Sequence, residues 1–174
     1  MIKRLLLSII ALVFLQPVVH CADDRPSKDV PELEVLSNYI GKWDVAITSK
    51  DSPFTKGDST AQWILNGRFV QQTGSLASSD VATAMKVTTL VTYDKKERAY
   101  RMWTFLSDGT SIEASGKWDA KSHTMTSVSQ RDGMTITTTA SFAKKGTEEW
   151  TIITKNKKGE MVGNFSGTNT LAKE

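Results

Sequence analysis

Short segments in which apolar and polar residues alternate fill the chain from Lys42 almost to the C-terminus. In the first of them Trp43, Val45 and Ile47 share one face, and this period of two predicts a half-buried β-strand. About ten such segments follow one another at a spacing of roughly 8–14 residues, with turn residues between them. After Ala84 no connection is long enough for a helical crossover, so neighbouring strands must pair antiparallel in chain order.

The turns and loop lengths indicate how these strands assemble. Asn66-Gly67 predicts a type I′ hairpin turn, which needs positive φ at both positions. Residues 75–84 are small and polar, and they predict a longer connection, a flap over the mouth of a barrel. A ten-stranded meander with open edges would invite aggregation, and closing it removes both edges. We therefore predict an all-β fold: a single antiparallel up-and-down β-barrel of about ten strands with a short N-terminal helix. The alternative is a two-sheet sandwich, which would need longer crossing loops.

The predicted helix lies just before the first strand. Pro31 suits its first turn, and Asp29 is available as its N-cap. Leu33, Leu36 and Ile40 fall near helical spacing, which gives the helix one apolar side. Gly41 then ends it, because glycine readily adopts the left-handed conformation found after helices.

The N-terminal segment predicts export. Lys3 and Arg4 precede an apolar run over residues 5–15 that is too short to span a bilayer. We expect residues 1–21 to be a signal peptide, with a membrane anchor as the alternative. Cleavage after Cys21 fits the small residues there. Acylation of Cys21 is the rival, and it is disfavoured because the preceding His20 is not small.

The rest of the chain then divides into a mobile polar leader, residues 22–32, and a barrel domain, residues 33–174. The protein is expected in the periplasm or secreted. Lys and Arg outnumber Asp and Glu by 22 to 19, and by 20 to 19 once Lys3 and Arg4 leave with the signal. No concentrated basic face with interleaved aromatic residues occurs, so we expect no nucleic-acid partner. The oligomeric state is not predicted.

Several short motifs carry a family resemblance. Gly41-Lys42-Trp43, after a short N-terminal turn, resembles the Gly-x-Trp motif of lipocalins, in which the tryptophan closes one end of the barrel. The more specific motifs are Gly67-Arg68-Phe69, Tyr93-Asp94, and Tyr100 with Trp103. Together they resemble an uncharacterised bacterial lipocalin-like family, the domain of unknown function numbered fifteen seventy-nine. The resemblance covers about residues 33–171. It implies a calycin-type barrel, similar to lipocalins and fatty-acid-binding proteins, and no known activity.

Aromatic residues on several strands are the candidate ligand-binding residues. Tryptophans can fill a small barrel as core, or they can wall a ligand pocket together with a few polar anchors. A barrel of about ten strands leaves room for a small ligand. The candidate residues are Trp43, Trp63, Tyr93, Arg101, Trp103, Phe105, Trp118 and Trp150.

The strand over residues 98–106 allows two orientations. If Trp103 and Phe105 point inward, strict alternation brings Arg101 inward as well. A buried guanidinium needs an anion, and a ligand carboxylate would serve in a bidentate pair. If Tyr100 and Met102 point inward instead, Arg101 lies on the surface.

Catalytic and metal-binding motifs are lacking in the sequence. No Gly-x-Ser-x-Gly turn occurs, and no cysteine nucleophile remains after export. His123 is the sole candidate for an axial haem ligand, and its polar strand predicts a solvated side chain. The carboxylates of Glu113, Glu148 and Glu149 are also predicted to be solvated. We expect no cofactor and no metal ion.

The sequence therefore predicts an exported barrel that carries or sequesters a small apolar or amphipathic ligand, one that bears a carboxylate if Arg101 points inward. One alternative is an enzyme built in the same barrel, with Arg101, Tyr93 or His123 acting on a bound substrate. The other is a fully packed structural module whose outer face or 75–84 loop meets a partner.

Overall fold

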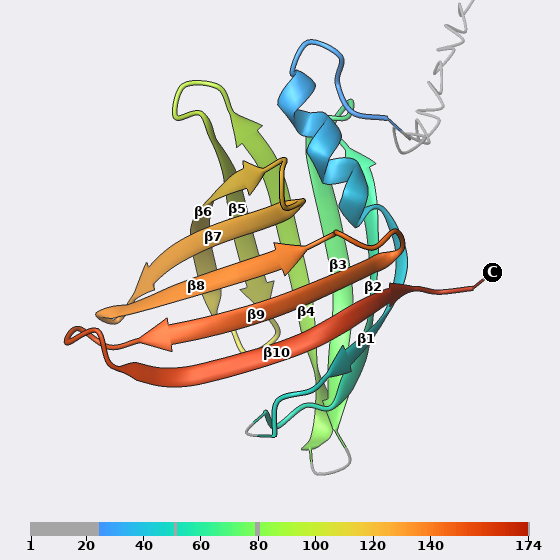
Figure 1. Ribbon diagram of the computed structural model, residues 1–174. Helices are drawn as coiled ribbons and strands as arrows, with labels where there is room; N and C mark the ends of the chain where they lie inside the picture. The colour runs from blue at the N-terminus through green and yellow to red at the C-terminus, as the bar shows by residue number, and fades with distance from the viewer. Residues whose placement is uncertain (1–24, 51, 79–80, 174) are drawn as a thin grey trace, which may run out of the picture.

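The computed structural model describes residues 25–50, 52–78 and 81–173, and these residues form one closed β-barrel with a short helix. The predicted signal peptide and Cys21 lie outside the described residues. The elements are the 3₁₀ helix η1 (Pro31–Tyr39) and the strands β1 (Gly41–Ile47), β2 (Lys56–Ile64), β3 (Phe69–Ser78), β4 (Val81–Asp94), β5 (Ala99–Leu106), β6 (Ser111–Asp119), β7 (Thr124–Arg131), β8 (Met134–Ser141), β9 (Thr147–Lys155) and β10 (Met161–Leu171). The predicted ten-stranded barrel is confirmed (Figure 1).

Every strand pairs antiparallel with its neighbours in the chain, and β1 closes the barrel by pairing with β10. The register of this closing pair runs from Trp43 opposite Leu171 to Ile47 opposite Gly167. The first and last strands therefore share one continuous ladder, and no edge remains open between them. The two-sheet sandwich does not occur.

The turn at Asn66-Gly67 has the predicted backbone. Both residues have positive φ, 58° and 69°, and the amide of Arg68 donates to the carbonyl of Leu65 across the turn. The prediction of a longer connection over residues 75–84 is wrong for the described residues 75–78 and 81–84. Here β3 and β4 extend instead, with Leu76 opposite Met85. β3 also pairs with β2 on its other side, so its small polar residues are held in the sheet by backbone hydrogen bonds.

Helix η1 has three residues per turn, and its buried face follows that period. Val30, Leu33 and Leu36 are fully buried, and Tyr39 continues the row. Residues three apart eclipse one another in a 3₁₀ helix, so these side chains form one apolar row. Asp29 is not the N-cap: Val30 takes that position, and no side chain caps the helix.

The segment before the helix contacts the barrel. The amide of Ser27 donates to the carbonyl of Gly67 at 3.0 Å. The guanidinium of Arg68 donates to the Asp29 carboxylate at 2.6 Å, so Asp29 links this segment to the barrel. The hydroxyl of Tyr100 donates to the carbonyl of Glu32 at 2.8 Å. These bonds hold η1 across one end of the barrel (Figure 1).

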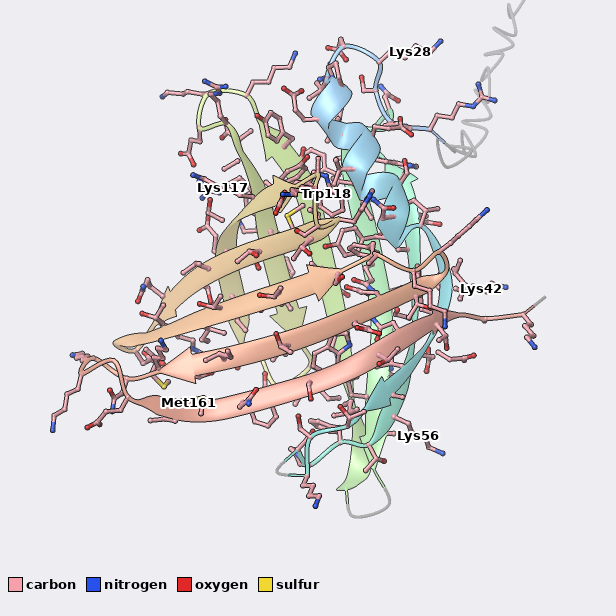
Figure 2. All side chains as sticks on the ribbon, viewed as in Figure 1. Lys28, Lys42, Lys56, Lys117, Trp118 and Met161 are labelled. Carbon is pink, nitrogen blue, oxygen red and sulfur yellow. The ribbon has the colours of Figure 1, made fainter. Side chains whose placement is uncertain are left out.

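The apolar core lies directly beneath η1. Its buried members come from the helix row and from inward positions of six strands; they are Val30, Leu33, Leu36, Ala61, Trp63, Val70, Val91, Tyr100, Met125 and Ala140. Trp118 lies at this end and packs against the cluster, whereas Lys28, Lys42, Lys56 and Lys117 extend away from the barrel (Figure 2). One end of the barrel is therefore filled and covered, which leaves the other end for a cavity.

Candidate functional site

A cavity of about 500 Å³ occupies the interior of the barrel. Inward-facing residues of all ten strands line it, together with Tyr39 at the end of η1. Ligand pockets for small molecules commonly have volumes of about 300–1,000 Å³. Its apolar lining residues are Val45, Leu76, Val87, Val91, Met102, Leu106, Ile112, Ala114, Met125, Ile136, Ala140, Trp150, Ile152 and Phe165.

The polar groups of the wall are mainly hydroxyls and amides, and several of them bond to one another. Gln72 donates through Nε2 to the hydroxyl of Ser59 at 3.1 Å. The hydroxyls of Thr89 and Thr104 lie 3.0 Å apart on neighbouring strands. These four groups therefore meet part of their hydrogen-bonding capacity within the wall.

Glu148 is a buried carboxyl group in the cavity wall, so the prediction that its side chain is solvated is wrong. Its side chain is buried and lines the cavity near the start of β9. It lies opposite Asn169 of β10 in the sheet register, and the Asn169 amide donates through Nδ2 to Oε2 of Glu148 at 2.7 Å. Glu113 and Glu149 are exposed, as predicted.

Asn169 links Glu148 to a tryptophan in a fixed direction. The indole of Trp150 donates through Nε1 to Oδ1 of Asn169 at 3.0 Å. An indole N–H can only donate, so the amide oxygen must accept and the amide nitrogen is left to donate to Glu148. The chain of bonds therefore runs from Trp150 through Asn169 to the carboxylate.

Burial alters the protonation of this group. Desolvation raises the pKa of Glu148 from its ordinary 4.5 to about 7, and the hydrogen bond from Asn169 only partly opposes that rise. Burial, and then the negative charge of Glu148, raise the pKa of Tyr39 well above its usual value. Both groups line the cavity, Tyr39 at the end of η1 and Glu148 near the start of β9.

A glycine makes room for the tryptophan in this group. Trp150 lies opposite Gly167 in the sheet. A Cβ atom at Gly167 would overlap the indole ring of Trp150 and the backbone oxygen of Ala46 on β1. The bare backbone lets the ring lie flat enough over β10 to reach Asn169.

Strand β5 takes the second of the two orientations that its sequence allows. Met102 and Thr104 line the cavity, so alternation directs Arg101, Trp103 and Phe105 to the outer face. None of these three lines the cavity, and Phe105 is exposed.

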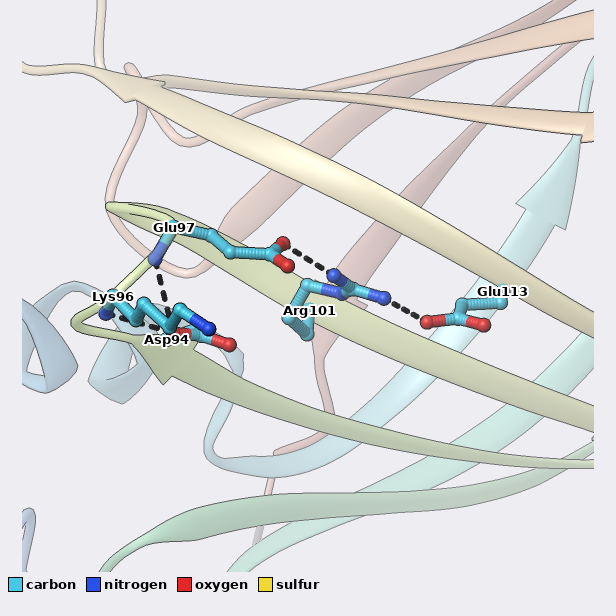
Figure 3. A network of polar contacts seen from close by, with 5 residues as sticks. All are labelled: Asp94, Lys96, Glu97, Arg101 and Glu113. Carbon is cyan, nitrogen blue, oxygen red and sulfur yellow. Dashed lines mark hydrogen bonds and ion pairs between the residues drawn. The ribbon is translucent and has the colours of Figure 1, made fainter.

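On the outside, Arg101 is held between two carboxylates. Its guanidinium donates to Glu97, at the turn before β5, and to Glu113 on β6 (Figure 3). These two bonds raise the pKa of Arg101, Glu113 having the larger effect. The guanidinium also lies 6.0 Å from the centre of the Trp103 ring. Arg101 therefore has its anions already, and it is on the wrong face to bind a ligand in the barrel.

Among the aromatic candidates, only Trp150 lines the cavity. Trp43 and Trp63 are buried, and the Trp43 indole donates to the carbonyl of Tyr39 at the end of η1 at 2.8 Å. Tyr93 and Trp118 pack against the core beneath the helix. The tryptophans therefore mostly fill the covered end, and aliphatic side chains form most of the cavity wall.

His123 lies away from the cavity. It is exposed, it has a positive φ of 51°, and its ring meets the edge of Trp118 at 6.2 Å. Within the described parts of the chain, no three His, Cys, Asp or Glu side chains gather in a way that could hold a metal ion. Those parts also contain no helix of the length and apolar character that crossing a membrane requires.

Comparison with known proteins places the chain in a protein family. The model of a family described as "Protein of unknown function (DUF1579)" matches residues 29–157. The match begins just before η1 and ends after β9, so it includes most of the barrel and Glu148. A search of curated proteins found no match.

Proposed function

Since the chain belongs to the DUF1579 family, whose function is unknown, we propose from the barrel itself that the protein binds a small apolar or amphipathic molecule inside its cavity. The observation that carries this proposal is the cavity of about 500 Å³, which has an aliphatic wall and one buried carboxyl group. Water gains few hydrogen bonds against such a wall. An apolar guest would gain about 25 cal/mol for each Å² of apolar surface that it removes from water.

The lining of the cavity extends along most of β9. Along β9 the lining residues are Glu148, Trp150, Ile152 and Thr154, which run from the covered end towards the opposite end of the barrel. Glu148 and Thr154 lie about 20 Å apart along the strand at the usual rise per residue. A molecule with a chain or a narrow ring system would fill this length.

A carboxylate-bearing ligand lacks a partner in this arrangement. No described lining residue is Lys or Arg, and Arg101 is paired with Glu97 and Glu113 on the outside. We therefore favour an apolar ligand, or an amphipathic one whose head group is not anionic.

The two alternative functions fit the structure less well. A fully packed module would have no cavity of this size. An enzyme built on Arg101, Tyr93 or His123 would need those groups in the cavity wall, and none of the three lies there. We also propose that the protein is exported, on the basis of its charged and apolar N-terminal segment. Intact mass measured on protein from its own host would then lack residues 1–21, and a mass that includes them would contradict export.

The binding proposal is tested with a neutral probe and a pair of matched variants. Diphenylhexatriene is an apolar hydrocarbon whose fluorescence rises in apolar surroundings. The protein should bind it saturably. Ala114 lines the cavity, whereas the adjacent Ser115 is exposed. Ala114→Trp should abolish the signal by filling the cavity, and Ser115→Trp should leave it unchanged. Absence of saturable binding, or equal binding by both variants, would refute an interior site.

A further inference from the structure

The buried carboxyl group of Glu148 has unused hydrogen-bonding capacity. Only Oε2 receives a hydrogen bond from a described residue, the 2.7 Å bond from Asn169. The side chain is 7% exposed and lines the cavity. A buried carboxylate that keeps one oxygen free is costly unless a donor meets it. The open side of Glu148 faces the space in which a ligand would lie.

The charged residues described in the cavity wall are both acidic. No described lining residue is Lys, Arg or His. Asp58 is the second acidic residue of the lining, but it is exposed and accepts a hydrogen bond from the hydroxyl of Ser75 at 2.7 Å. Glu148 is therefore the buried charge of the interior, and nothing described in the wall neutralises it.

Resting on the binding function proposed above, we propose that the ligand is an amphipathic amine, whose protonated head binds Glu148 and whose apolar body extends along the cavity. A protonated amine has several N–H donors and a positive charge, so its bond to a carboxylate is charge-assisted and stronger than a neutral one. A hydroxyl head would form only a neutral or singly charged bond, and a carboxylate head would meet a like charge.

The neighbours of Glu148 agree with this head group. Trp150 and Tyr39 also line the covered end of the cavity, and an ammonium group is attracted to the faces of aromatic rings. Asn169 is held by Trp150 on one side and donates to Glu148 on the other. It stabilises Oε2 without competing for the free oxygen.

The pairing predicts how affinity changes with pH. The groups that face Glu148 are Tyr39 from η1 and Asn169 from β10, with Tyr100 from β5 beyond Tyr39. Burial keeps both tyrosines neutral, raising the pKa of Tyr100 to about 12 and that of Tyr39 well above its usual value. Glu148 is thus the group in this set that titrates near neutral pH, with a pKa of about 7. Amine affinity should fall about fivefold over the first pH unit below that value and about tenfold for each further unit, because binding needs the carboxylate.

The experiment compares three probes of equal chain length: decylamine, decanol and decanoate. Each is titrated calorimetrically into the mature protein, residues 22–174, at about pH 8, where an alkyl amine stays protonated. Decylamine should bind about tenfold or more tightly than decanol, and decanoate should bind most weakly. Glu148→Gln should remove that advantage, so that the variant binds decylamine no more tightly than decanol. Glu149→Gln is the matched control, since it removes the adjacent, exposed carboxylate, and it should change nothing.

The outcomes separate this inference from the binding function. If decanol binds as tightly as decylamine, or if both glutamate variants bind the amine equally, the amine assignment is overturned and the cavity function stands. If neither a decyl probe nor diphenylhexatriene binds, the binding function is refuted as well. Should Glu148→Gln fail to fold, the wild-type protein decides: decylamine affinity must fall about fivefold between about pH 7 and pH 6, and decanol affinity must fall by less.

Discussion

Replacing the buried carboxyl group should change how stability depends on pH. In the folded protein Glu148 keeps its proton up to a pKa of about 7, whereas an ordinary glutamate, as in the unfolded chain, loses it near 4.5. Between these values the folded state binds more protons than the unfolded state. The free energy of unfolding therefore falls as the pH rises through this window. The stabilisation that comes from the proton on folded Glu148 is fully present below about pH 4.5 and is lost above about pH 7.

The size of this loss follows from the two pKa values. Two and a half pH units correspond to about 3 kcal/mol. Glu148→Gln has no proton to lose, so the difference in unfolding free energy between variant and wild type should move by about 3 kcal/mol in favour of the variant between about pH 4 and pH 8. Carboxylates whose pKa is lowered, such as Asp29 and Asp119, titrate alike in both proteins and cancel in that difference.

Urea unfolding followed by tryptophan fluorescence measures these free energies. Wild type, Glu148→Gln and Glu149→Gln are unfolded at both pH values, and Glu149→Gln should follow the wild type because its side chain is exposed. The difference in unfolding free energy between wild type and Glu148→Gln could instead be the same at both pH values. Glu148 would then be solvated in the folded protein, and its burial at the covered end of the cavity would be wrong.

Three further substitutions test separate parts of the structure. Gly167→Ala should destabilise the protein by about 1–3 kcal/mol and shift the emission of Trp150, since a methyl group there overlaps the indole; unchanged stability would contradict that packing. Tyr100→Phe leaves the carbonyl of Glu32 without its donor. It should cost about 1 kcal/mol and speed hydrogen exchange in η1, and unaltered exchange would show that this bond does not hold the helix. Arg101→Ala should leave the affinity for diphenylhexatriene unchanged, because Arg101 lies outside the barrel; weaker binding by a folded variant would contradict its placement.

The number and pairing of the strands could be predicted because turn residues mark where each strand ends. Asn66-Gly67 predicted a hairpin turn, and both residues have the positive φ that this turn requires. Residues 75–84 misled for a physical reason: small polar residues have little strand preference of their own. The described residues of this range, 75–78 and 81–84, are extended because β3 pairs on both sides, with β2 and with β4. Such pairing depends on distant segments, so local composition does not reveal it.

The orientation of β5 could not be decided from its own residues, since Tyr100 and Met102 are apolar on one face and Trp103 and Phe105 on the other. The sheet decides it. Register places Arg101 on the side where it meets Glu97 and Glu113. The same limit applies to the period of η1. The helix has three residues per turn, so Tyr39 continues its buried row, and Ile40 packs against the core just after the helix ends.

The sequence does contain a signal that Glu148 faces the interior. It shares parity with Trp150 and Ile152, so alternation along β9 places it inside if they are inside. A lone carboxylate among apolar residues is normally a surface group, and the prediction that Glu148 is solvated rests on that rule. Its partner Asn169 lies 21 residues further along the chain, and only the pairing of β9 with β10 brings the two together.

Native mass spectrometry of the protein purified from its own host tests the hollow barrel most directly. We predict a mass above that of the polypeptide, from a retained small molecule that is released on unfolding. Ala114→Trp should lose this extra mass, and Ser115→Trp should keep it. The bare polypeptide mass in every sample, or an adduct that survives in Ala114→Trp, would contradict a guest held inside the barrel.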